Sequence, residues 1–65
     1  MGRYAPMTEL KKRRKALGLN QTQLAERAGV CQTAISQYEK GECFPRRGVL
    51  EKLAAVLNCS IHDLL

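Results

Sequence analysis

Apolar side chains recur every three or four positions along most of this chain, which is the spacing of a helix with one buried face. The first such stripe falls on Met7, Leu10, Arg14 and Leu17, and Gly18 follows where a left-handed residue would stop a helix. We therefore predict a helix over residues 7–17, with these four side chains facing the core.

The same spacing, together with residues that begin or end helices, predicts four further helices. Asn20 and Ser60 suit the N-cap position, and Gly29 and Gly41 suit the residue that follows a helix. The predicted ranges are 21–28, 32–39, 46–57 and 61–65.

The chain of 65 residues has room for one small domain. Because no segment alternates with a period of two, we predict an all-α, compact five-helix domain over residues 7–65, preceded by a flexible N-terminal arm over residues 1–6. No apolar run approaches the roughly 20 residues that cross a bilayer, and the N-terminus lacks the apolar core of a signal peptide. We expect a soluble, cytoplasmic protein that makes no membrane contact.

Metal and catalytic chemistry find little support in the residue inventory. Cys31, Cys43 and Cys59 are an odd number without a CxxC pair, and His62 is the only histidine. We expect reduced thiols, no metal and no cofactor. The chain also has no nucleophile beside a plausible base and no glycine-rich phosphate loop, so we expect neither an enzyme nor a small-molecule ligand.

Positive charge is high for so short a chain. Eleven Lys and Arg residues oppose six Asp and Glu residues, giving a formal net charge of +5, and five of the cations are consecutive at residues 11–15. Such a field attracts polyanions. Taken alone, the run of cations is also consistent with a solvated basic helix.

Residues 21–41 have the composition of two short helices that cross at close range. Such a crossing needs a small residue where the helices meet, a glycine at the turn and apolar side chains facing inward. Ala25 and Gly29 meet the first two needs. The inward apolar set is Leu24, Val30, Ile35 and Tyr38.

With that face buried, a helical wheel leaves five polar side chains pointing outward from the third predicted helix, which begins at residue 32. Four of these side chains are uncharged. They are Gln32, Thr33, Ser36, Gln37 and Lys40. Glutamine can bond adenine N6 and N7, threonine can contact the thymine methyl group, and serine can bond either partner. This face is suited to contact DNA bases, although a merely solvated polar face is the alternative.

Residues 7–65 resemble the phage-repressor and Cro-like helix-turn-helix family, also called the XRE family. The segments that carry the resemblance are, in order, GLNQTQLAERAGV, TAISQYEKG, Pro45, LEKLAAVL and SIHDLL. The resemblance implies a lambda-repressor-like five-helix domain whose third helix lies in the major groove of double-stranded DNA. It also implies a symmetric homodimer.

Individual roles follow from the resemblance by position. Gln32, Thr33 and Gln37 fall on the base-contacting positions of the family, whereas Ser36 and Lys40 would contact the DNA backbone or flanking bases. The resemblance also implies phosphate contacts by Gln21, Arg46 and Arg47. The positive charge of Arg3, Lys11 and Lys12 should add to the attraction for phosphates. Arg47 has an alternative role as the partner of a nearby carboxylate.

Arg14 lies on the face of the first helix that should be buried, where an unpaired guanidinium would be costly. The resemblance supplies Glu39, at the end of the third helix, as its partner. Arg14 and Glu39 would then form a structural ion pair that joins the two helices.

Cys31 departs from the family pattern, because the family usually has Ser or Thr at this position before the third helix. A thiol accepts hydrogen bonds weakly, so some capping energy, of order 1 kcal/mol, would be lost. A thiol with a lowered pKa, which would make DNA binding redox-sensitive, is the alternative interpretation.

These observations predict a sequence-specific DNA-binding transcriptional regulator, and more specifically a repressor that binds a palindromic operator as a dimer. The dimer interface is expected near the last two helices, at Leu57, Asn58, Ile61 and Leu65, with Leu64 a further candidate. The alternative is an antitoxin-like or other protein-interaction module that uses the same fold.

Overall fold

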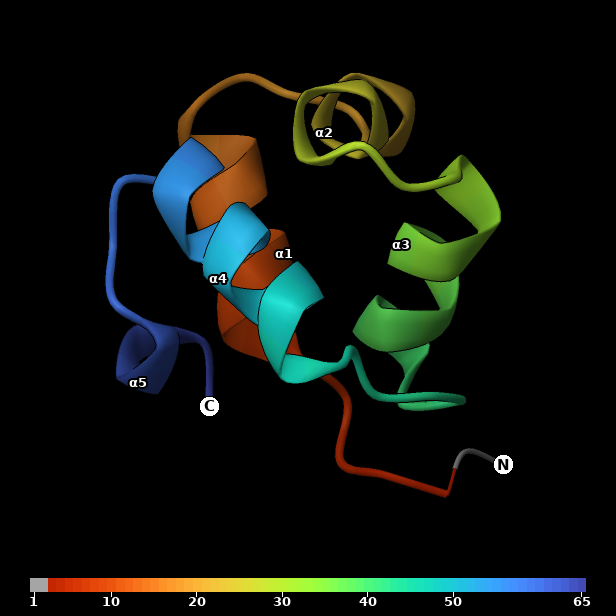
Figure 1. The fold of residues 1–65 in the computed structure, drawn as a ribbon. Coiled ribbons are helices and arrows are strands. Elements are labelled where there is room, and N and C mark those ends of the chain that lie inside the picture. Colours follow the sequence, from red (N-terminus) through yellow and green to blue (C-terminus); the bar gives the residue numbers. More distant parts are fainter. Residues whose placement is uncertain (1–2) are drawn as a thin grey trace.

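The computed structural model describes residues 3–65, which form five helices joined by short turns (Figure 1). The helices are α1 (Thr8–Ala16), α2 (Gln21–Ala28), α3 (Gln32–Lys40), α4 (Arg47–Val56) and α5 (Ile61–Leu64). Each observed end lies within one residue of the end predicted from the sequence. No helix in this part of the chain is long and apolar enough to span a membrane.

The helices enclose a single apolar core. Each contributes one large side chain that is almost fully buried: Leu10, Leu24, Ile35, Leu53 and Leu64. Helix α2 packs against α3 and α4, whereas α5 packs against α1 and α4. Figure 1 shows α3 and α5 on opposite sides of the domain, so α5 does not cover α3.

Local chemistry explains where the helices begin and end. The Asn20 side chain accepts a hydrogen bond from the Gln23 amide at 2.7 Å, and the Gln23 side chain accepts one from the Asn20 amide at 2.9 Å. Gly29 and Gly41 end α2 and α3 in the left-handed conformation, with φ of 72° and 80°. Ser60 caps α5 through a bond from the Asp63 amide. These four predicted caps and stops are confirmed.

The prediction that Leu17 faces the core is wrong. Its side chain is 50% exposed, because α1 ends at Ala16 and the chain turns at Gly18, where φ is 71°. Leu19, beyond the turn, is only 7% exposed and fills the buried position instead. The helical spacing of the sequence therefore continues one residue beyond the end of the helix.

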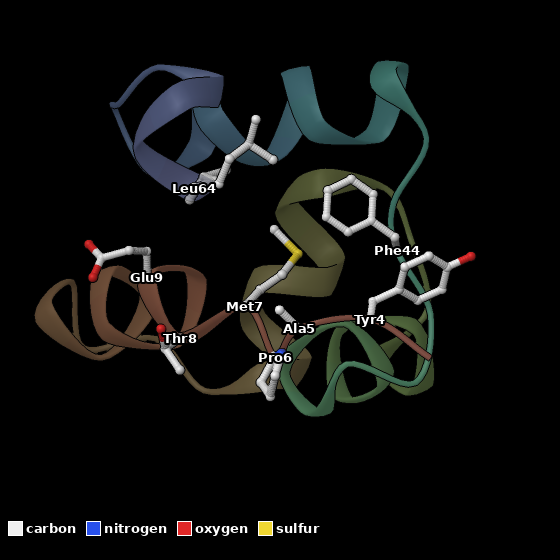
Figure 2. A pocket seen from close by; sticks show the side chains of 9 residues that line it. Tyr4, Ala5, Pro6, Met7, Thr8, Glu9, Phe44 and Leu64 are labelled. Atoms are coloured by element: carbon white, nitrogen blue, oxygen red, sulfur yellow. The ribbon is translucent and has the colours of Figure 1, made fainter. Parts of the chain in front are cut away.

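The segment before α1 lies against the end of α3. The Tyr4 amide donates to the Gly41 carbonyl at 2.9 Å, and the Met7 amide donates to the Tyr38 carbonyl at 3.2 Å. The rings of Tyr4 and Phe44 lie side by side, with centroids 5.9 Å apart, at the edge of a shallow pocket (Figure 2). The flexible arm predicted for residues 1–6 includes Met1 and Gly2, which lie outside the described residues, and its flexibility stays a prediction.

Candidate nucleic-acid interface

Helices α2 and α3 meet at a tight corner made possible by small residues. Ala25 and Ala28 are buried at the crossing, and the Val30 amide donates to the Ala25 carbonyl at 3.0 Å just after Gly29. Because Ile35 and Tyr38 are also buried, the opposite face of α3 is left outward. The corner thus sets which residues of α3 are accessible.

The predicted base-contacting residues share this outward face. Gln32, Thr33 and Gln37 are exposed, and Ser36 is half-buried. Lys40 is exposed at the last position of α3. The face therefore offers hydroxyl and amide groups along its length and a positive charge at one end.

Arg14 and Glu39 are brought together beneath this face. Arg14 Nε donates to Glu39 Oε2 at 2.7 Å, Nη2 donates to Oε1 at 3.2 Å, and Nη1 donates to the Leu19 carbonyl at 2.8 Å. The side chains are 8% and 4% exposed. Such a fork of charge-assisted bonds satisfies the guanidinium where water does not reach it. The ion pair therefore joins α1 to α3, and the guanidinium is buried away from any ligand.

Gln21 connects this buried pair to the surface. Its Nε2 donates to Glu39 Oε1 at 3.0 Å, and its Oε1 accepts a hydrogen bond from Gln32 Nε2 at 2.6 Å. A continuous series of bonds thus runs from Arg14 through Glu39 and Gln21 to Gln32. We term these four residues the α1–α3 relay.

The relay adds to the role that the resemblance gave Gln21. Both ends of its amide contact protein groups, so its backbone N–H, at the first position of α2, is the group better placed to meet a phosphate. The sequence did not reveal the bond to Gln32. The available signal was two glutamines at the first positions of consecutive helices.

Gln37 has a neighbour that the sequence analysis did not connect with it. Cys43, in the loop after α3, lies with Sγ 3.4 Å from Gln37 Oε1. This contact and the one between Gln21 and Gln32 both involve a glutamine on the outward face of α3. The two candidate base-contacting glutamines are therefore each held by a neighbouring side chain.

Exposed cations predicted to contact phosphate lie on α1 and at the start of α4. Arg46 is exposed at the N-cap of α4, and Lys11 is exposed on α1. Arg47 Nε lies 3.7 Å from Glu51 Oε1 in a well-exposed pair, so the alternative partner considered for Arg47 is present. An exposed pair of this kind contributes about 0–1 kcal/mol, which a phosphate could readily offset.

Cys31 occupies the N-cap of α3 and is exposed. Within residues 3–65, the Cys31 side chain accepts no hydrogen bond from the backbone of α3. The first amide groups of α3 therefore remain able to donate hydrogen bonds. Towards the other end of α3, burial is the main cause that raises the pKa of Tyr38. Tyr38 therefore keeps its proton at neutral pH.

The residues predicted to form a dimer interface are divided between the core and the surface. Leu57 and Leu64 are buried within the chain's own core, whereas Asn58 is exposed, with φ of 55°. Ile61 is half-buried, and Leu65 is 68% exposed. Ile61 and Leu65 also line a shallow pocket with Phe44 and Pro45. An apolar surface is thus present beside α5.

The family model described as Helix-turn-helix matches residues 10–64 of this sequence. The chain belongs to the helix-turn-helix family. Two curated helix-turn-helix relatives are regulators by name. The HTH-type transcriptional regulator SinR of Bacillus subtilis (strain 168) is 40% identical over 57 residues, covering 86% of this chain and 51% of SinR. The cryptic phage CTXphi transcriptional repressor RstR of Vibrio cholerae is 38% identical over 55 residues, covering 85% of this chain and 49% of RstR.

The chain spans about half the length of these two relatives. Among solved helix-turn-helix structures, the P22 c2 repressor in complex with synthetic operator 9T matches with a TM-score of 0.87 and 39% identity, covering 94% of each chain. The resemblance to phage repressors and the five-helix, all-α fold predicted from the sequence are thereby confirmed.

Proposed function

We propose that this chain is the DNA-binding part of a transcriptional repressor and that α3 enters the major groove. The observation that carries the proposal is the outward face of α3, where Gln32 and Gln37 are exposed but held by protein contacts. Amide groups fixed on a helix of this size can match the donors and acceptors of base edges. The match to a repressor solved with its operator supports the same geometry.

The proposed mechanism divides the work between two classes of contact. Gln32, Thr33 and Gln37 contact base edges, with Ser36 at the margin, and thereby select the sequence. The backbone N–H of Gln21 and the cations Lys11, Lys40, Arg46 and Arg47 contact phosphates and fix the position of α3 in the groove. Occupation of the site would repress transcription by blocking polymerase.

We further propose that two copies bind a palindromic site as a homodimer. The exposed part of the predicted interface, Asn58, Ile61 and Leu65, is the candidate contact. Two-fold symmetry of the protein would then be mirrored in half-sites about one helical turn apart. The proposal also assigns the chain to the cytoplasm and gives it no enzymatic activity.

In-vitro selection of double-stranded oligonucleotides from a randomised pool tests the proposal. We expect enrichment of one sequence with two inverted half-sites, whose affinity falls with rising salt because phosphate contacts release counterions. Arg46→Gln should reduce the magnitude of the slope of log affinity against log salt by about 0.9 for each bound copy, hence by about 1.8 for the dimer, and Lys52→Gln, on α4 but outside the proposed contacts, should leave it unchanged. Failure to enrich any sequence above the starting pool would overturn the proposal.

A further inference from the structure

Cys43 is a side-chain hydrogen-bond partner of Gln37, and we propose that it is a positioning residue that presents the Gln37 amide to DNA. Sγ of Cys43 lies 3.4 Å from Gln37 Oε1, within the range of a thiol hydrogen bond, and the thiol is the donor because the amide oxygen can only accept. The inference rests on the proposed function, since Gln37 matters in this way only if α3 contacts bases.

Cys43 is the fixed member of the pair. It is half-buried and packs against the core, whereas Gln37 is exposed on α3. The backbone beside Cys43 is also held, because the Glu42 amide donates to the Gln37 carbonyl at 2.9 Å and the Tyr4 amide donates to the Gly41 carbonyl at 2.9 Å. A long, exposed glutamine side chain is mobile by itself. The contact therefore restricts Gln37 rather than Cys43.

The contact also sets which polar atoms Gln37 offers. One lone pair of Oε1 is directed to the thiol, while the second lone pair and both Nε2 hydrogens remain available. Donors in that position suit the acceptors that bases expose in the major groove, which are N7 of both purines, O6 of guanine and O4 of thymine. We assign Gln37 a preference for a base that presents such an acceptor over cytosine, whose major-groove amino group is a donor, and this preference is enforced by Cys43.

Gln32 supports this interpretation from an independent contact. Its Nε2 is engaged by Gln21 Oε1 at 2.6 Å, so the first glutamine of α3 is also ordered before any ligand is present. Side chains that are ordered in advance lose less rotamer freedom on binding. Cys43 would do for Gln37 what Gln21 does for Gln32.

The first test needs no DNA. The Gln37 side-chain amide is followed by ¹⁵N NMR relaxation in wild type, Cys43→Val, Cys43→Ala and Cys43→Ser. We expect the order parameter of Gln37 Nε2 to fall in the Val and Ala variants, which lack a donor, and to be retained in Cys43→Ser. Cys59→Val, which removes a half-buried thiol elsewhere, is the matched control and should leave it unchanged. Equal order in all variants would overturn the proposal.

The second test uses the oligonucleotide selected by the wild type. The base pair contacted by Gln37 is the one at which Gln37→Ala loses discrimination. At that base pair, Cys43→Val should lower the preference for the selected base by about threefold to tenfold, whereas Cys43→Ser restores it. In the Gln37→Ala background, Cys43→Val should have no further effect, as expected of a residue that acts only through Gln37.

The outcomes separate this inference from the proposed function. If the wild type selects no sequence, both are overturned. A second outcome is that the wild type selects a site at which Cys43→Val shows the same base preference as the wild type, while the variant unfolds at the same temperature. In that case the positioning role of Cys43 is overturned and the proposed function stands.

Discussion

Arg14 Nε lies 2.7 Å from Glu39 Oε2, and both side chains are more than nine-tenths buried. The pair joins α1 to the end of α3, and Gln21 extends it to Gln32 on the surface. Removal of one partner leaves a buried charge without a counter-charge, which is costly in a water-free site.

Arg14→Met should therefore lower the free energy of unfolding by about 3–5 kcal/mol, enough to leave a domain of this size only marginally folded. Urea denaturation followed by circular dichroism measures the change. The double variant Arg14→Met/Glu39→Met should recover part of the loss, because no unpaired charge remains. An unchanged urea midpoint in Arg14→Met would show that the pair contributes little.

Gln32→Ala should weaken binding to the selected oligonucleotide by roughly 1–3 kcal/mol and change binding to random DNA little, since the side chain would contact bases and not phosphates. Fluorescence anisotropy at fixed salt compares the two affinities. Equal losses on both DNAs would remove Gln32 from the base-contacting residues.

Gly41→Ala should destabilise the domain more than Gly29→Ala. Both glycines have positive φ, so each alanine suffers the left-handed strain of roughly 1–2 kcal/mol. A Cβ on Gly29 meets no atom within 4 Å, whereas one on Gly41 would overlap the Tyr4 carbonyl oxygen. Urea denaturation measures the free energy of unfolding of both variants. The additional loss in Gly41→Ala relative to Gly29→Ala is the cost of displacing the segment before α1. Equal losses would mean that this segment moves away at no cost.

Cys31→Ser should stabilise the domain by up to about 1 kcal/mol. The serine hydroxyl can accept a hydrogen bond from the first turn of α3, a bond that the thiol does not make within the described residues. Cys59→Ser is the control, because Cys59 packs against the core and its replacement by a hydroxyl should destabilise. Thermal unfolding measures both. A Cys31→Ser variant no more stable than wild type would show that water caps α3 equally well.

Acid should remove the stabilisation that comes from Asp63. The Ser60 backbone amide, and after it the Ser60 hydroxyl, holds the pKa of this carboxyl below its ordinary value. A lowered pKa in the folded state stabilises fully above the ordinary pKa, about 3.9, and the effect is lost as pH falls through the lower value. The melting temperature of Asp63→Asn should therefore lie below that of wild type at pH 7, and the difference should shrink as the pH falls below the ordinary pKa of the carboxyl. A constant difference across this range would contradict the role of the charge.

Local features of the sequence were sufficient to predict the helices. Asn20, Gly29 and Gly41 act on neighbouring backbone groups, so their roles follow from residue type and position. Leu17 shows where this reasoning fails, because the turn at Gly18 ends the helix before the apolar spacing ends. A helical wheel cannot show that Leu19 replaces it.

The outward face of α3 was likewise predictable, since it is the complement of the buried positions. The contacts that order it were not. Gln21 and Gln32 are 11 residues apart and belong to different helices, and Cys43 reaches Gln37 only because the loop folds back after Gly41. Their pairing depends on the crossing of the helices and on side-chain rotamers, neither of which residue spacing determines.

The α1–α3 relay has a consequence for engineering. Only two of its four members lie on α3, so a recognition helix grafted from this chain into a relative would carry Glu39 and Gln32 but leave Arg14 and Gln21 behind. The transplanted helix would keep its sequence, but the Gln32 side chain would lose the hydrogen bond to Gln21 that restrains it. A transferable unit of specificity in this fold would therefore include Arg14 of α1 and Gln21 of α2, although the Arg14 side chain is buried beneath the surface proposed to contact DNA.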